Sequence, residues 1–199
     1  HLEDTFYDRM YKHDVNNYLS ITSGGKLKKV GLFRDEVDLR KKNEALIVKK
    51  AVNNHIFTGE DIETFIKSSK DILDFIYYYK CTSAFKSFIV YDDDITKKVP
   101  QQKVVRWYKS NKVKSLLYRE RVQETSTHTN LGDVAKINNS ENCKVIQILP
   151  EEFPQDIDYD HYIWEAKKII NRCYASQKVK HLNQKREELK EQKNDGDYL

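Results

Sequence analysis

The stretch YKHDVNNYLSITSGGKLKKVGLF, residues 11–33, predicts a β-hairpin. Two alternating runs of apolar and β-branched residues flank Gly24-Gly25, a pair that suits a tight turn between antiparallel strands. The first predicted strand carries an unusual polar group, made of Asp14, Asn16, Asn17 and Tyr18. Asparagine is a poor strand former, so these side chains either meet a ligand or satisfy local backbone groups at a strand end.

Composition indicates a folded, polar protein. Charged residues make up 33% of the 199 residues and aromatic residues 12%, with a mean hydropathy of −0.79. No apolar run approaches the roughly 18 residues of a transmembrane helix, and no signal-peptide pattern is seen at the start. The cysteines are dispersed and form no metal-binding pair, which suits a reducing compartment. We therefore expect a cytoplasmic protein with no membrane partner.

Charge is segregated along the chain. Residues 97–119 contain eight Lys or Arg and no acid, whereas residues 151–160 contain five acids and no base. In the basic stretch, cations alternate with Trp107 and Tyr108, a pattern that suits contact with phosphates and bases. A solvated sheet edge protected by lysines is the alternative explanation.

Hydrophobic periodicity predicts an α+β fold. Helical spacing covers residues 45–57, 60–67 and 71–79, with Asp71 as N-cap of the third helix. Short strands are expected at 87–91, 103–110, 115–119 and 144–149, forming a small antiparallel unit, with a loop over 125–142. A final amphipathic helix over 160–172 would begin at Asp160 and bury Ile163, Ala166 and Ile170.

One acidic motif invites a catalytic interpretation. Tyr91-Asp92-Asp93-Asp94 follows an apolar strand and matches the YxDD pattern with which reverse transcriptases hold two divalent metals. Aspartate is also among the commonest turn residues, and no second carboxylate strand precedes this one. The sequence favours a turn.

Several segments resemble family B DNA polymerases, particularly those of bacteriophages. DVNNYLSI followed by SGGKLKKVGLF is similar to the segment just downstream of their catalytic carboxylates, and Tyr18 matches the tyrosine of a Lys-Lys-x-Tyr motif there. Val15 and Asn16 replace the two lysines of the cellular members. Further similar segments follow in the same order, namely ALIVKKAVNNHIFTGEDIETFI, DILDFIYYYKC, VVRWYKSNKVKSLLYR and DIDYDHYIWEAKKIIN.

The resemblance covers residues 14–171 and implies the outer palm and the thumb of such a polymerase. It divides the chain into a palm hairpin (1–34), a helical thumb core (35–86), a basic β-rich thumb subdomain (87–149), and a C-terminal helix with a charged tail (150–199). These parts would grip the primer-template duplex during DNA replication. The catalytic palm, fingers and exonuclease domain would be partners of this chain, and they would hold the Mg²⁺. No catalytic residue, metal site or cofactor is expected in the chain itself.

The residues expected to contact DNA are Asn16, Asn17, Tyr18, Lys26, Lys28, Lys29, Lys49, Lys50, Arg106, Tyr108, Lys109, Lys112 and Lys114. On the polymerase interpretation, the first three face the nascent duplex and bind minor-groove acceptors that all four base pairs share. A free-standing, non-sequence-specific nucleic-acid-binding or virion-associated protein is the alternative. A complete nucleotidyltransferase that uses Asp93 and Asp94 is a third hypothesis. Because a two-stranded hairpin is marginally stable, we also expect an apolar face of the 11–33 hairpin to be left exposed or to be covered by another chain.

Overall fold

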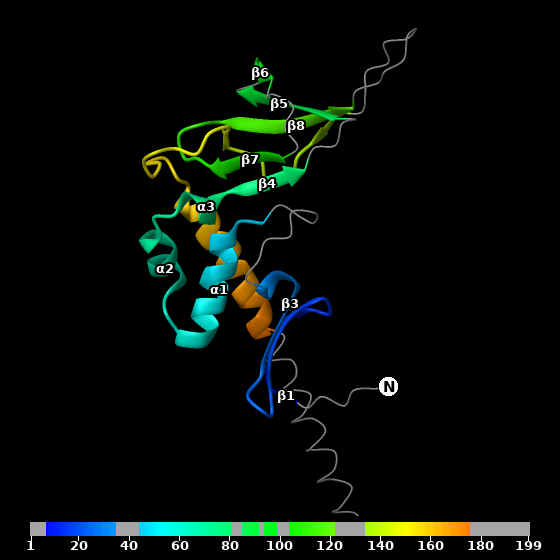
Figure 1. The fold of residues 1–199 in the computed structure, drawn as a ribbon, viewed down its shortest axis with the longest axis vertical. Coiled ribbons are helices and arrows are strands. Elements are labelled where there is room, and N and C mark those ends of the chain that lie inside the picture. The colour runs from blue at the N-terminus through cyan, green and yellow to red at the C-terminus, as the bar shows by residue number, and fades with distance from the viewer. Residues whose placement is uncertain are drawn as a thin grey trace, which may run out of the picture.

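The computed structural model describes residues 7–34, 44–80, 85–91, 94–98, 104–121 and 134–175. In this part of the chain the fold is α+β, with helices and three antiparallel sheets. Figure 1 shows one sheet at one end of the long axis, a layer of helices in the middle, and the other two sheets at the opposite end. The acidic pair Asp92-Asp93 and the charged tail (176–199) lie outside the described residues.

The N-terminal sheet is a three-stranded meander of β1 (Tyr7–Asp14), β2 (Asn17–Thr22) and β3 (Leu27–Val30). The predicted hairpin is confirmed as β2 and β3, and the Gly25 N–H donates to the Thr22 carbonyl across the turn, at 2.8 Å. The prediction of one long first strand is wrong, because the chain reverses direction between Asp14 and Asn17. There the Asp14 carboxylate accepts the Asn16 N–H at 2.9 Å, a local bond that favours a turn over a strand.

The meander packs on helices of its own chain. Leu19 on β2 and Phe33 in the short 3-10 helix η1 (Gly31–Phe33) are fully buried. The Asn53 side chain, on α1 (Leu46–Thr58), donates to the Phe33 carbonyl at 3.1 Å. The chain's own helices therefore cover this face at Leu19, contrary to the expectation from sequence, whereas Leu27 on the same face is 40% exposed.

The three predicted short helices are confirmed as α1, α2 (Ile62–Ser68) and α3 (Ile72–Phe75). Gly59 ends α1 in a left-handed conformation (φ 75°), and Asp71 caps α3 by accepting the Leu73 N–H at 3.0 Å. The third helix is shorter than predicted, because Tyr77–Lys80 forms strand β4. Tyrosines favour strands, and a neighbouring strand pairs with this segment.

The C-terminal helix covers residues 159–175 and buries Ile163, Ala166 and Ile170 as predicted. Its N-cap differs from the prediction, because Asp158 rather than Asp160 accepts the His161 N–H, at 3.2 Å. No helix among the described residues is long and apolar enough to cross a bilayer.

The predicted β-unit consists of two sheets. One has the order β10-β7-β4, with β7 (Val104–Lys109) between β4 and β10 (Cys143–Ile146). The other has the order β6-β5-β8-β9, with bounds Asp94–Lys98, Phe85–Tyr91, Ser115–Arg121 and Val134–Lys136. Strand β9 lies where a loop was expected, because its three residues are too few to give a periodic signal.

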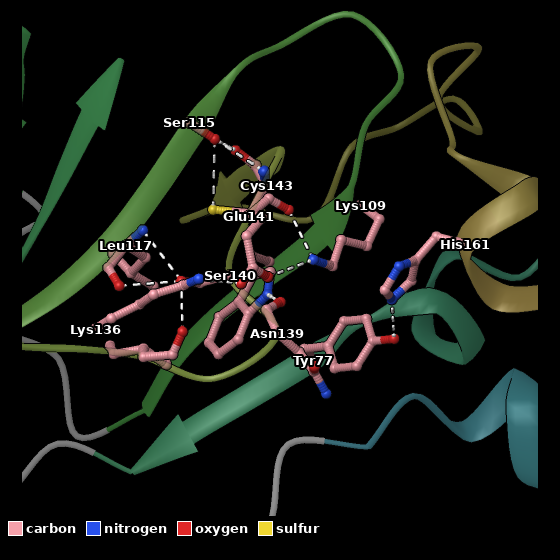
Figure 2. A network of polar contacts seen from close by, with 12 residues as sticks. Tyr77, Lys109, Ser115, Leu117, Lys136, Asn139, Ser140, Glu141, Cys143 and His161 are labelled. Carbon is pink, nitrogen blue, oxygen red and sulfur yellow. Dashed lines mark hydrogen bonds and ion pairs between the residues drawn. The ribbon is translucent and has the colours of Figure 1, made fainter. Parts of the chain in front are cut away.

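Two buried serines hold strand β8: Ser115 joins it to β10 of the other sheet, and Ser140, in the connection between β9 and β10, bonds to its backbone (Figure 2). The Ser115 hydroxyl donates to the Cys143 carbonyl at 2.7 Å and accepts the Cys143 N–H at 2.8 Å. Ser140 bonds in the same manner to the Leu117 carbonyl and N–H, at 3.0 and 3.1 Å. The Ser115 hydroxyl therefore bonds to backbone of the other sheet, and the Ser140 hydroxyl fixes the connection that leads into it; both limit how the two sheets can move relative to each other.

Tyr162 joins the C-terminal helix to both the helical layer and β7. Its buried hydroxyl accepts the Lys109 N–H at 2.9 Å and donates to the Phe75 carbonyl at 2.7 Å. Its ring stacks on Tyr77, with 5.8 Å between centroids, and Tyr77 stacks on Trp107. Burial raises the pKa of Tyr162 well above its ordinary value, so the phenol stays a donor.

The change Tyr162→Phe keeps the ring and removes both hydrogen bonds. It leaves a buried N–H and a buried carbonyl unpaired, so we expect the free energy of unfolding to fall by about 2 kcal/mol in chemical denaturation. Tyr159→Phe is the matched control, because Tyr159 is half-buried and packs against the same Phe75 ring. Equal losses for the two variants would contradict this role of the Tyr162 hydroxyl.

Candidate nucleic-acid interface

Asn17 is a structural residue of the meander. Its amide nitrogen donates to both Asp14 carboxylate oxygens, at 2.8 and 2.9 Å, and its amide oxygen accepts the Leu32 N–H at 2.9 Å. Gly31, with φ +61°, faces this amide so closely that a Cβ there would collide with the Asn17 oxygen. Both ends of the side chain are used, which favours the local-backbone explanation for Asn17. The Asn16 side chain is exposed at the turn.

The outward face of the meander gathers cations around a tyrosine. The strand register places Lys12 opposite Tyr18, and Lys28 one pair further along on the same face. The Lys28 ammonium lies 6.0 Å from the centre of the Tyr18 ring. We call Lys12, Tyr18 and Lys28 the meander face. The exposed Lys26 follows the turn beside it.

Lys29 lies on the other face of the meander, the one that packs on the helices. Lys29 pairs across the strands with the buried Leu19, and its ammonium lies 5.9 Å from the centre of the Phe57 ring on α1. Two further predicted contacts on α1 neutralise acids. Lys49 is buried and lies 2.9 Å from Glu44, and Lys50 lies 2.7 Å from the buried Asp74. Lys29 and Lys49 therefore contribute to packing inside the chain, whereas Lys50 is exposed and pairs with a buried acid.

Two of the predicted DNA contacts on β7 are buried. Tyr108 donates its hydroxyl to Asp156 at 2.8 Å, and burial raises the pKa of this phenol. Lys109 is 3% exposed and donates to the Glu141 carbonyl at 2.7 Å, as Figure 2 shows. Both side chains are buried, on opposite faces of β7, and β7 is the central strand of its sheet. The alternative of a solvated edge strand is therefore wrong.

Arg106 lies on the same face of the sheet as Tyr108 but is partly exposed. It pairs across the strands with Tyr78 on β4, and its guanidinium carbon lies 5.9 Å from the centre of the Tyr78 ring. On the neighbouring strand β10, Lys144 pairs with Tyr108, and its ammonium lies 5.9 Å from the centre of the Tyr108 ring. We call Tyr78, Lys80, Arg106 and Lys144 the basic-aromatic face.

Three residues of this face, Tyr78, Lys80 and Lys144, were not predicted from the sequence. Each carries a period-two signal within its own strand, but only the pairing of β4, β7 and β10 places them beside Arg106. Lys80 and Lys144 are exposed. Lys112 and Lys114 are exposed too, in the connection between β7 and β8.

Asp156 belongs to the acidic stretch 151–160 and contacts one edge of the basic-aromatic face. It accepts the Ser110 hydroxyl at 2.8 Å and lies 3.4 Å from the Lys144 ammonium. Burial would raise the pKa of Asp156, but hydrogen bonds from Ser110 and Tyr108 outweigh it and lower the pKa. The carboxylate offsets part of the Lys144 charge, so Arg106 and Lys80 are the stronger candidates for binding an anion.

No group of His, Cys, Asp or Glu that could hold a metal occurs among the residues that the structure describes. Strands β5 and β6 pair antiparallel with Tyr91 opposite Asp94, and Asp92 and Asp93 of the motif lie outside the described residues. Comparison of the chain with protein-family models, curated proteins and solved structures finds no match. Function is therefore inferred from the sequence and from this geometry.

The acid sensitivity of the meander tests the contacts of Asp14. Burial would raise the pKa of Asp14, but hydrogen bonds from Asn17, His13 and the Asn16 N–H outweigh it and lower the pKa from 3.8 to about 2. A carboxyl group whose pKa falls on folding stabilises the fold above its unfolded pKa. That stabilisation is lost as the pH falls towards the folded pKa.

We therefore expect Asp14→Asn to lower the Tm at neutral pH. The difference from wild type should shrink between about pH 4 and about pH 2, as the wild-type carboxylate takes up its proton. Thermal denaturation across this pH range measures the difference directly. A difference that stays constant down to about pH 2 would show that the ionised carboxylate does not hold the turn.

Proposed function

We propose that this chain is the palm-edge and thumb portion of a family B DNA-directed DNA polymerase, and that it grips the primer-template duplex during replication. The resembling segments follow one another in the same order as in those enzymes, over residues 14–171. The mixed α+β fold with antiparallel sheets supports the proposal at the level of fold class. The catalytic carboxylates and their Mg²⁺ belong to the remaining polymerase domains, which are the expected partners.

The observation that carries the proposal is the basic-aromatic face. Arg106 lies over the Tyr78 ring, which limits the rotamers of its long side chain and leaves the guanidinium partly exposed. A cation held in this manner loses less conformational entropy when it binds a phosphate. Lys80 and Lys144 place further positive charge on the same face of the sheet. Phosphate contacts of this kind are independent of sequence, as a replicative grip requires.

The meander face is the second part of the proposed grip. Tyr18 matches the family tyrosine and lies between Lys12 and Lys28 on the outward surface. Its phenol would donate to minor-groove acceptors, and the two lysines would contact phosphates beside it. Asn16 remains a candidate for the same groove, whereas Asn17 holds the turn beneath them.

The isolated chain should bind a short DNA duplex with an affinity that falls steeply with salt. Lys80→Ala and Arg106→Ala should each weaken binding several-fold and lower the salt slope by about 0.9, because each removes one phosphate contact. Fluorescence anisotropy of a labelled duplex measures both quantities. Lys67→Ala is the matched control, since Lys67 is exposed but already paired with Glu63 at 2.6 Å.

Two results would contradict the proposal. Binding that is independent of salt would exclude a phosphate grip. An equal loss in Lys67→Ala and Lys80→Ala would mean that net charge alone, and not the basic-aromatic face, attracts the DNA. A natural reading frame that continues upstream into carboxylate motifs would support the polymerase, whereas a frame without them would support the free-standing binding protein.

A further inference from the structure

The connection from β10 to the C-terminal helix carries an exposed apolar loop. Ile148 is 87% exposed, the largest fraction among the large apolar side chains that the structure describes, and the adjoining Leu149 is 50% exposed. Every residue from 147 to 152 is exposed. We call residues 147–152 the apolar loop. Contiguous exposed apolar surface, unlike a single exposed side chain, marks an interaction site.

Both ends of the apolar loop are held by the core. Ile146, the last residue of β10, is buried, and the Phe153 ring lies edge-on to the buried Phe75 ring, with 5.6 Å between centroids. Pro150 and Pro154 each fix one further backbone angle of this connection. The two exposed aliphatic side chains therefore lie on a short connection that is tied down on either side, so binding them costs little conformational entropy.

The charge at the apolar loop is negative. Glu151 and Glu152 are exposed, and the connection contains no cation between its two anchors. No ion pair joins either glutamate to another residue in the described part of the chain. The Lys70 ammonium lies 5.4 Å from the centre of the aromatic ring that follows the loop, and Lys144 is paired with Asp156 at 3.4 Å. Two unpaired carboxylates thus lie beside the exposed aliphatic side chains, against one ammonium.

We propose that the apolar loop docks onto an apolar patch with a cationic rim on a partner polypeptide. Its aliphatic side chains offer no ring on which a base could stack, and its carboxylates would repel the phosphates of a nucleic acid or an anionic lipid surface. Two copies of the loop that faced each other in a symmetric dimer would bring like charges together. Apolar side chains within a ring of Lys or Arg complement both features of the loop. The inference does not depend on the polymerase assignment.

A labelled peptide of leucine and lysine that forms an amphipathic helix of about 14 residues is the probe, because it presents an apolar stripe between cations. In fluorescence anisotropy the chain should bind this Leu-Lys peptide, and should bind far more weakly a Leu-Glu peptide with glutamate in place of lysine. Ile148→Ser should weaken binding about tenfold, because it removes an aliphatic side chain from the interface. Val15→Ser is the matched control and should bind as wild type does, since Val15 is 71% exposed in the meander, at the other end of the long axis (Figure 1).

Charge reversal tests the role of the carboxylates. Glu151→Lys should weaken binding of the Leu-Lys peptide several-fold at low salt and strengthen binding of the Leu-Glu peptide. Asp8→Lys makes the same change in net charge at an exposed position of β1 and should do neither.

The proposal is overturned if Ile148→Ser binds the Leu-Lys peptide as tightly as wild type, or if Glu151→Lys keeps the wild-type preference between the two peptides. It is also overturned if Ile148→Ser abolishes co-sedimentation with phosphatidylcholine vesicles, which would assign the loop to a membrane. Self-association that the same variant abolishes would assign the loop to a second copy of the chain instead. Ile148→Ser should leave binding to duplex DNA unchanged, so this proposal and the duplex grip fail separately.

Discussion

The hydroxyl of Tyr162 is the contact on which the arrangement of the described parts depends. It connects the carbonyl end of α3 to the backbone of β7, and its ring continues the stack of Tyr77 and Trp107. Both backbone groups are buried, so without this hydroxyl each would lose its partner at a cost of about 1 to 3 kcal/mol. The C-terminal helix thereby fixes where β4 and β7 lie, and with them the basic-aromatic face.

The two proposed DNA-binding surfaces follow one physical rule. Cations that lie over aromatic rings, such as Lys28 over Tyr18 and Arg106 over Tyr78, keep part of their charge at the surface while their positions are restricted. Cations that are buried, such as Lys49 and Lys109, are instead used to neutralise internal acids or to satisfy carbonyls. Burial therefore decides which of the basic residues are available to a polyanion.

The sequence predicted those parts of the fold that depend on local signals. The Gly24-Gly25 turn, the Asp71 cap and the buried stripe of the C-terminal helix are each encoded within a few residues. Predictions failed where distant segments decide the outcome. Tyr77–Lys80 continues a helical pattern but pairs with β7, and Asn17 is held by Leu32, which lies fifteen residues away. The basic-aromatic face needs three strands from separate parts of the chain, so no single segment could reveal it.

Changes in backbone amide chemical shift on addition of a short DNA duplex are the most direct test of whether the basic-aromatic and meander faces bind it, because they report the bound surface without any substitution. If these faces grip the duplex, we expect shifts at outward positions of β4, β7 and β10, including Tyr78, Arg106 and Lys144. Shifts are also expected at Tyr18 and Lys28 of the meander. The amides of the C-terminal helix around Trp164 should not shift with the duplex. Shifts confined to that helix, or absent from the basic-aromatic face, would show that this face does not bind the duplex.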